Sequence, residues 1–523
     1  MHTRPLKTQT LLRIGLIAVI LVVLNFVSVR LFGRLDLTRN HVFSLSPASK
    51  ILMKNLDDKV TIRAYFTEDL PAPYSMNRRL LIDELNEYKA YGGGNLEFEF
   101  IDPSTEKAER DAQQQGVAPV QVQVINQDKL EVKKAYMGLV FLYEDKKEII
   151  PVVQNTSTLE YDISSTIKRL TAKSQKKIGF LSGNGEPALS DLGQAQAALR
   201  KQYQIADVDV TKGKPVPSDI AILMIVAPTS RISEPQKFQI DQYLMRGGRV
   251  AFLVNRIEAS LQEQYGRPLD TGLDDMLACY GARVNPDLVR DVQCANVTIM
   301  QQQAGFSMQS QVPFPYIPIV SAFDKGNAMV KDLQGLILLF GSSVDTIGLG
   351  DKGLHGEVLF RSSKQSGRQT GVFAFDPMTR WSRDEFPESG IPLGVLIEGQ
   401  FHSLYAGKPA PTDTAAGSIP PPANPLTTSP ETRIVVIGDG DFVKDRSTSR
   451  DDITFFANLA DYLADDAGLI AIRSKDVSEP PLEPVSDGTK QAVKYANMIL
   501  PPLIVLGYGL FRWRKRQFLK KLD

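Results

Sequence analysis

The sequence predicts an α/β fold in which two transmembrane helices at the termini flank a soluble region. That region should hold a small mixed α/β domain and a doubly wound, Rossmann-like sheet domain. Two uncharged apolar stretches near the chain ends predict the membrane helices. Between them, near-continuous apolar runs such as AILMIVA alternate with helical patterns. Such runs are typical of parallel strands that are covered on both faces.

The two apolar stretches predict how the chain is placed in a membrane. A cytoplasmic tail (1–10) should lead into a first membrane helix (11–32), and a second membrane helix (495–511) should lead into a basic tail (512–523). Each uncharged core has roughly 16–17 residues, near the lower limit for a spanning helix. The first stretch could instead be a cleaved signal peptide, and the second a buried hairpin helix.

Cationic residues beside these stretches predict the orientation. They are Arg13, Arg512, Arg514, Lys515 and Arg516. Because such flanks stay in the cytoplasm, both termini should be cytoplasmic and the central region periplasmic, or otherwise extracytoplasmic. The central region is mildly acidic, which argues against nucleic acid as a partner.

The chain after the first membrane helix begins with a juxtamembrane connector (33–56). Within it, Ser46 and Pro47 have the pattern of an N-cap and a first helical position, which predicts a helix up to about Leu56. The small domain (57–171) should follow. Its expected strands are VTIRAYF, LEFEFID, VQVQVIN, YMGLVFLYED and KKEIIPVV, and its expected helices are MNRRLLIDELNEYKAY, 104–116 and YDISSTIKRLTA.

The doubly wound domain (172–475) should hold the parallel sheet. Its expected strands include KKIGFLSG, QIADVDV, DIAILMIVAP, RVAFLVN and RIVVIGDGDFV. The last of these, with the helix DDITFFANLADYLAD, should rejoin the sheet, since a lone strand–helix pair could not bury its faces. QVPFPYIPIV indicates a loop or an edge strand. A Pro-rich insertion (407–432) indicates a surface loop or a disordered segment, and a stalk (476–494) leads to the second membrane helix.

Several phrases of the sequence resemble one family. They are LDLTRNHVFSLSPASKIL, VTIRAYFTEDLP, LEFEFIDP, KIGFLSGNGE, DQYLMRGGRVAFLVN and RIVVIGDGDFV. In this order they resemble the GldG-type family, auxiliary components of ABC transport systems that were first tied to gliding motility. The resemblance implies an ABC permease and an ATPase as partners. It also implies a central domain similar to the class I glutamine-amidotransferase-like fold.

Two turns at strand ends are the candidate ligand-binding places, because open α/β sheets bind ligands at the carboxyl ends of their strands. The first turn holds Gly183, Asn184, Gly185 and Glu186, and could present backbone N–H groups to an anion or a sugar. The second holds Asp439 and Asp441, a carboxylate pair for a cation or a polar ligand. Alternatively, glycine and aspartate simply make tight turns at both places.

Catalytic and cofactor motifs are absent from the sequence. It contains no GxxxxGK[ST] phosphate loop, no GxSxG and no HExxH, and its four histidines have no metal-ligand spacing. Cys279 lies in a helical pattern and Cys294 in an expected loop, so neither has the setting of a nucleophile; the two could pair or stay free. We therefore expect no catalytic residue, no metal and no cofactor.

Together these observations predict a non-catalytic accessory subunit of an ABC-type transport system in the bacterial inner membrane. Its periplasmic region would bind substrate, a partner protein or an envelope component such as a glycan. Two alternatives stay open. One is an envelope glycan-processing enzyme that uses the carboxylates of Glu186, Asp439 or Asp441, and the other is a purely structural envelope scaffold.

Overall fold

The computed structural model describes residues 44–473, with short gaps at 69, 71–73, 127–128, 154–155, 157, 173, 304–305, 332, 416, 465–467 and 471, and a few single residues nearer the termini. The chain divides into two compact units, Met1–Val477 and Ser478–Asp523. The expected membrane helices, tails and stalk lie almost wholly outside the described residues. No helix in the part of the chain that is described is long and apolar enough to cross a membrane.

The fold is mixed α/β with several sheets, and the first of them forms the small domain. Strand β1 (Val60–Phe66) pairs in parallel with β2 (Leu96–Ile101) and antiparallel with β5 (Met137–Tyr143), which pairs with β6 (Lys146–Ile150). The sheet is therefore mixed, in the order β2-β1-β5-β6. A separate hairpin joins β3 (Val120–Asn126) to β4 (Lys129–Ala135), and β4 is a strand that the sequence analysis did not predict.

Four helices accompany this sheet: α2 (Pro47–Lys54), α3 (Ser75–Tyr91), α4 (Glu106–Gln115) and α5 (Leu159–Thr171). Helix α2 begins as the sequence indicates, with Ser46 as N-cap and proline in its first turn. It belongs to the core of the small domain, where Met53 is buried. The buried Glu160 of α5 holds it there, since the carboxylate accepts bonds from the Ser46 N–H (2.6 Å) and the Ser49 hydroxyl (2.7 Å).

The large sheet has eight strands, and five of them are parallel. These five, in spatial order, are β8 (Gln204–Asp209), β7 (Lys177–Ser182), β9 (Ile220–Val226), β10 (Arg249–Leu253) and β24 (Thr428–Ile437). Numbered along the chain this is the order 2-1-3-4-5, which is one of the two common doubly wound orders. As predicted, the last strand and helix rejoin the sheet through the pairing of β24 with β10.

Three antiparallel strands extend the sheet beyond β24: β23 (Pro392–His402), β20 (His355–Arg361) and β17 (Ala322–Phe323). Strand β23 was not expected from the sequence. Strand β24 is longer than expected, because residues 428–432 of the proposed Pro-rich insertion already belong to it. The last five residues of the predicted insertion are therefore part of the sheet and not of a surface loop.

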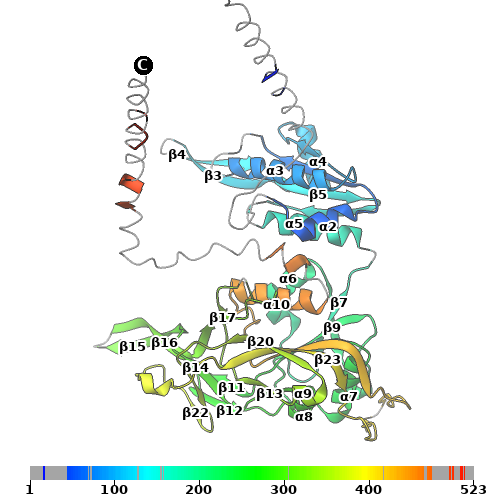
Figure 1. Ribbon diagram of the computed structural model, residues 1–523, viewed down its shortest axis with the longest axis vertical. Coiled ribbons are helices and arrows are strands. Elements are labelled where there is room, and N and C mark those ends of the chain that lie inside the picture. Colours follow the sequence, from blue (N-terminus) through cyan, green and yellow to red (C-terminus); the bar gives the residue numbers. More distant parts are fainter. Residues whose placement is uncertain are drawn as a thin grey trace, which may run out of the picture. The chain divides into compact units, whose positions relative to one another are not determined.

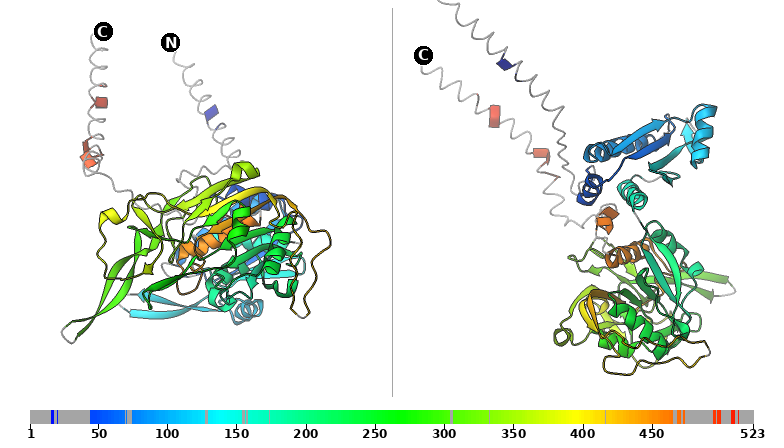
Figure 2. Two further views of the ribbon diagram at one scale, coloured as in Figure 1. Left: turned by 90° about the horizontal axis from the view of Figure 1, so that it is seen from below. Right: turned by 90° about the vertical axis from the view of Figure 1, so that its right-hand side faces the viewer.

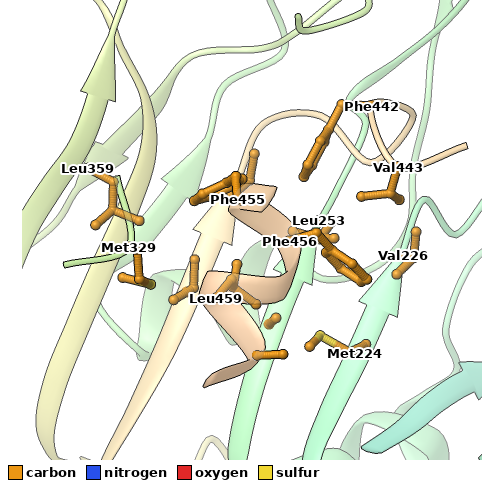
Figure 3. Close-up of a cluster of buried hydrophobic side chains, with 14 of the residues drawn as sticks. Met224, Val226, Leu253, Met329, Leu359, Phe442, Val443, Phe455, Phe456 and Leu459 are labelled. Atoms are coloured by element: carbon orange, nitrogen blue, oxygen red, sulfur yellow. The ribbon is translucent and has the colours of Figure 1, made fainter. Parts of the chain in front are cut away.

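Helices cover both faces of the large sheet (Figure 1). Helices α6 (Gly193–Arg200) and α10 (Arg450–Leu463) contribute to one core, and α7 (Glu234–Met245) and α8 (Asp274–Cys279) to the other. Figure 3 shows the first core, where Phe456 of α10 lies beside Met224 of β9 and Leu459 lies toward Met329. These side chains are fully buried. Such two-sided burial explains the near-continuous apolar runs of the parallel strands.

The segment between β10 and β24 carries several smaller sheets. One holds β11 (Ile257–Ser260), β12 (Tyr265–Pro268) and β22 (Phe373–Ala374); others pair β13 (Ala282–Val284) with β19 (Val344–Thr346), and β14 (Leu288–Asp291) with β21 (Ser366–Gln369). A long hairpin joins β15 (Cys294–Gln303) to β16 (Phe306–Val320), which also pairs with β18 (Leu336–Ile337). The hairpin projects from the sheet (Figure 2). The short helices here and elsewhere are α9 (Leu349–Lys352), η1 (Leu189–Leu192), η2 (Thr211–Gly213) and η3 (Arg383–Glu385).

Two expectations in this segment can be compared with the structure. QVPFPYIPIV was expected to be a loop or an edge strand, and it forms most of β16, which has β15 as its partner. Cys294 was expected in a loop, but it is the first residue of β15. The loop assignment was wrong because the partner residues that make this segment a strand follow only after the hairpin turn.

Candidate strand-edge site

The candidate residues lie at the carboxyl edge of the parallel strands. Residues 183–186 follow β7, and residues 438–441 follow β24. The loop after β7 lies at the point where the strand order reverses, because β8 lies on one side of β7 and β9 on the other. Ligands of doubly wound sheets bind at such a switch point. The location thus agrees with the sequence argument for the first turn.

The turn after β7 is closed by its own hydrogen bonds. The backbone N–H of Asn184 donates to Glu186 Oε2 (2.7 Å). The carbonyl of Asn184 accepts the backbone N–H groups of Thr229 (3.0 Å) and Ser230 (2.9 Å), which follow β9. The Thr229 hydroxyl donates to the carbonyl of Gly185 (3.1 Å). Two neighbouring strand ends are thereby joined across the switch point.

Both glycines of this turn have left-handed backbone conformations, Gly183 with φ +110° and Gly185 with φ +78°. A Cβ added to Gly185 would lie 2.0 Å from the Thr229 hydroxyl oxygen. The position therefore requires glycine on two grounds, backbone conformation and close approach. Asn184 is buried, at 4% exposure, whereas Glu186 is half-buried. Burial raises the pKa of Glu186 above its ordinary value, and the hydrogen bonds from Asn184 oppose that shift.

The turn after β24 is also closed by protein groups. The Asp439 carboxylate is fully buried and accepts the backbone N–H groups of Leu339 (2.6 Å) and Asp441 (2.7 Å). Asp441 accepts a bond from the Asn255 amide (3.0 Å) and pairs with Lys444 (2.5 Å). Burial and the neighbouring Asp441 carboxylate raise the pKa of Asp439 well above its ordinary value. Both carboxylates therefore contribute hydrogen bonds to the turn itself.

The two turns do not form one cluster of carboxylates. Strands β9 and β10 separate β7 from β24, so the turns lie about 14 Å apart at the usual spacing of paired strands. Only the later part of the β24 loop reaches the β7 side. There the Asp445 carboxylate accepts the backbone N–H groups of Gly193 (2.9 Å) and Gln194 (2.8 Å) at the start of α6. Glu186 and Asp441 are thus held by different partners.

Metal and nucleophile chemistry find little support in the described residues. Among them, no group of three or more histidine, cysteine or acidic side chains is arranged to hold a metal ion. Cys279 and Cys294 are free thiols, and burial raises the pKa of each, which disfavours the reactive thiolate. The sequence left open whether Cys279 and Cys294 form a disulfide, and in the structure both are free.

Three residues of the strand-edge loops were not singled out from the sequence: Thr229, Asn255 and Asp445. Thr229 lies three residues after the end of β9, and Asn255 lies two residues after the end of β10. A search for polar residues just after buried strands could therefore have found both. Their partners, however, lie 44 and 186 residues away along the chain. Asp445 caps a helix that begins 252 residues earlier. No local pattern reveals such pairs.

Comparison with protein families decides the class of the chain. A family model described as "ABC-type uncharacterized transport system", for auxiliary components, matches residues 175–465, which is more than half of the chain. The chain belongs to this family. The matched range begins just before β7 and ends just after α10, so the ABC auxiliary region coincides with the large sheet and its helices. A second model, for a domain of unknown function, matches residues 39–142, a range that overlaps the small domain.

A relative of this ABC auxiliary protein extends along nearly all of its length. An uncharacterized protein of Borreliella burgdorferi is 22% identical over 527 residues, which is 97% of each chain. The N-terminal domain of mmIFT52 is similar at 14% identity and a TM-score of 0.34, over 55% of this chain and 97% of that one. The exo-β-1,4-mannosidase Op5Man5 from Opitutaceae bacterium strain TAV5 is similar at 9% identity and a TM-score of 0.22. The match covers 75% of this chain and 48% of the mannosidase.

The Gly185→Ala variant tests whether the first turn depends on its contact with Thr229. We expect a loss of unfolding free energy clearly above about 1–2 kcal/mol, the usual cost of a left-handed alanine, because the new Cβ also collides with Thr229. Gly407→Ala is the matched control: its φ is +73°, close to the +78° of Gly185, but a Cβ there meets nothing within 4 Å. Denaturant unfolding of the full chain measures both. Equal losses in the two variants would contradict the contact.

Glu186→Gln tests the raised pKa of the half-buried carboxyl. A carboxyl whose pKa is raised in the folded state stabilises the fold most at low pH, and this contribution is lost as pH rises through the folded pKa. Glutamine does not ionise, and its oxygen can still accept the Asn184 N–H. The melting temperature of the variant relative to wild type should therefore increase between about pH 4 and about pH 7.

Glu258→Gln is the control for this pH dependence, because Glu258 is an exposed residue of β11. The melting temperatures of all three proteins are compared across the same pH range. The melting temperature of the Glu186 variant minus that of wild type should rise with pH. If this difference stays constant or falls, burial does not raise the pKa of the Glu186 carboxyl.

Proposed function

We propose that the protein is a non-catalytic accessory subunit of an ABC-type transport system. In this proposal two terminal helices anchor it in the bacterial inner membrane, and the large central region lies on the periplasmic side. The observation that carries the proposal is the family match over the whole doubly wound region. An accessory role also accords with a sequence that lacks a phosphate loop, because such a chain needs a separate ATPase.

The strand-edge geometry supports a binding or assembly role rather than carboxylate catalysis. A glycosidase needs a carboxyl pair on the two sides of a scissile bond, at separations of about 5–9.5 Å. Glu186 and the Asp439–Asp441 pair lie three strands apart, and each is engaged in hydrogen bonds of its own turn. The expected partners are accordingly a permease and an ATPase, together with a substrate, an envelope glycan or another protein.

Co-purification tests the partner proposal. The tagged full chain, extracted from its own cells in a mild detergent, should bring with it a polytopic membrane protein and an ATPase with a phosphate loop, identified by mass spectrometry. A chain that ends at residue 493, and therefore lacks the second predicted membrane helix, is the matched control and should retain less of the permease. Absence of both partners under every mild extraction condition would overturn the accessory role.

Cysteine labelling tests the proposed topology. Cys279 and Cys294 are the two cysteines of the chain and can be replaced by serine. A single Val372→Cys substitution, at a side chain that is 69% exposed, should then react with a membrane-impermeant maleimide in cells whose inner membrane is intact. Lys520→Cys in the tail is the matched control and should react only after lysis. The reverse pattern would place the central region in the cytoplasm.

A further inference from the structure

A cavity of about 650 Å³ lies between the base of the β15–β16 hairpin and the segment 377–386. Its volume is in the range of sites that hold small ligands, about 300–1,000 Å³. It is lined by residues of the segment between β10 and β24, away from the strand-edge loops. The hairpin that forms one wall projects from the large sheet (Figure 2).

The lining of this cavity is largely apolar, and part of it faces solvent. Pro313 and Pro315 of β16 contribute one wall, and Val292 and Met378 contribute side chains that are 47% and 54% exposed. The stretch 292–323 contains no Asp, Glu, Lys, Arg or His, in a chain with 23% charged residues. Exposed strands usually carry charges that prevent unwanted association. A largely apolar lining that faces solvent beside this uncharged stretch indicates a binding surface.

Trp381 forms a rigid aromatic part of the lining. Its ring lies 5.8 Å from that of Tyr316 and 5.9 Å from that of Phe386, measured between centroids. The guanidinium of Arg290 lies over the indole, 5.1 Å from its centroid. Since Arg290 already covers the indole, Trp381 is a poor stacking platform for a sugar ring. Its remaining surface offers apolar contact.

The only charged side chains that line the cavity, among the described residues, are two arginines. Arg380 and Arg383 are both exposed. Neither of them forms an ion pair with a described residue, and no carboxylate lines the cavity beside them. The cavity therefore combines an apolar interior with two available cations. This combination is complementary to a ligand that has an apolar body and a negative group.

We propose that this cavity binds an amphiphile that has an acyl chain and an anionic head group, a carboxylate or a phosphate. The acyl chain would contact Pro313, Met378 and Trp381, and the head group would accept hydrogen bonds from Arg380 and Arg383. An extended peptide or an oligosaccharide would bring many polar groups against this apolar lining, and polar groups buried without partners are costly. The inference concerns a different place from the strand-edge loops and does not depend on the transport partners.

Quenching of tryptophan fluorescence by brominated ligands tests the proposal on the full chain. The chain has two tryptophans, Trp381 and Trp513, so Trp513→Phe leaves Trp381 as the reporter. In an amphipathic polymer that avoids detergent micelles, brominated hexadecanoic acid should quench Trp381 saturably. Brominated hexadecanol, which has no charge, should bind at least about tenfold more weakly, because it forms no charge-assisted hydrogen bonds. Brominated phosphatidylglycerol, titrated in parallel, distinguishes a phospholipid from a free fatty acid as the source.

Variants separate the two parts of the site. Arg380→Gln with Arg383→Gln should weaken binding of the acid at least about tenfold and leave binding of the alcohol unchanged. Met378→Asp should weaken both ligands. Met300→Asp is its matched control, since Met300 is 74% exposed on the β15–β16 hairpin but does not line the cavity. Circular dichroism confirms that each variant is folded.

Three outcomes would overturn the proposal. The first is equal affinity for the acid and the alcohol, which would show that no negative group is recognised. The second is an equal effect of Met300→Asp and Met378→Asp, which would show that quenching arises elsewhere on the surface. The third is protection of Trp381 by an oligosaccharide but not by unbrominated hexadecanoic acid, which would make the cavity a sugar site.

Discussion

The parallel pairing of β10 with β24 is the constraint on which the large domain depends. The chain leaves the parallel strands after Leu253 and rejoins them only with β24, where Val250 opposes Ile434 and Leu253 opposes Ile437. Without this return, β10 would be an open edge. Helix α10 follows β24 in the chain, so the return also brings α10 to the core in which Phe456 is buried. The return also sets where the antiparallel strands go, because β23 pairs with the other side of β24. The hairpin and the cavity are thus held between two strands that must meet.

This constraint accounts for the glycine–aspartate composition of the turn after β24. A Cβ on Gly438 would lie 1.9 Å from the carbonyl oxygen of Ser342, and one on Gly440 would lie 2.6 Å from that of Leu253. The acidic residues that follow hold the inserted segment against the sheet. Asp439 accepts the Leu339 N–H (2.6 Å), and Asp452 of α10 accepts the Ile337 N–H (2.9 Å). Two glycines and Asp439 of a turn that could indicate a cation site are therefore used to close the sheet.

Some elements could be predicted because their own apolar pattern identifies them, whatever strands or helices lie beside them in the fold. The buried strand AILMIVA and the helix DDITFFANLADYLAD, which forms most of α10, are of this kind. Strand β23 escaped prediction because Gly394 and Gly399 interrupt its apolar run, and only its pairing with β24 makes it a strand. Strand β4 was not predicted because its three lysines are typical of a polar connection between strands. The same limit holds for function. Strand-end loops can be found from local sequence, whereas the cavity joins residues near 292–315 to residues near 365–386.

The two candidate places differ in what a ligand would have to disrupt. At the strand edge, the Asn184 carbonyl and the Asp439 carboxylate already have partners. A ligand that displaced one of these partners would leave a polar group unpaired, at a cost of about 1–3 kcal/mol, unless it replaced that bond. In the cavity, a ligand breaks no ion pair of the described residues, and each Å² of apolar surface that it covers contributes about 25 cal/mol. The polar groups of the strand-edge turns thus stabilise the fold. A ligand would gain more net free energy by binding in the cavity beside the hairpin than by binding at these turns.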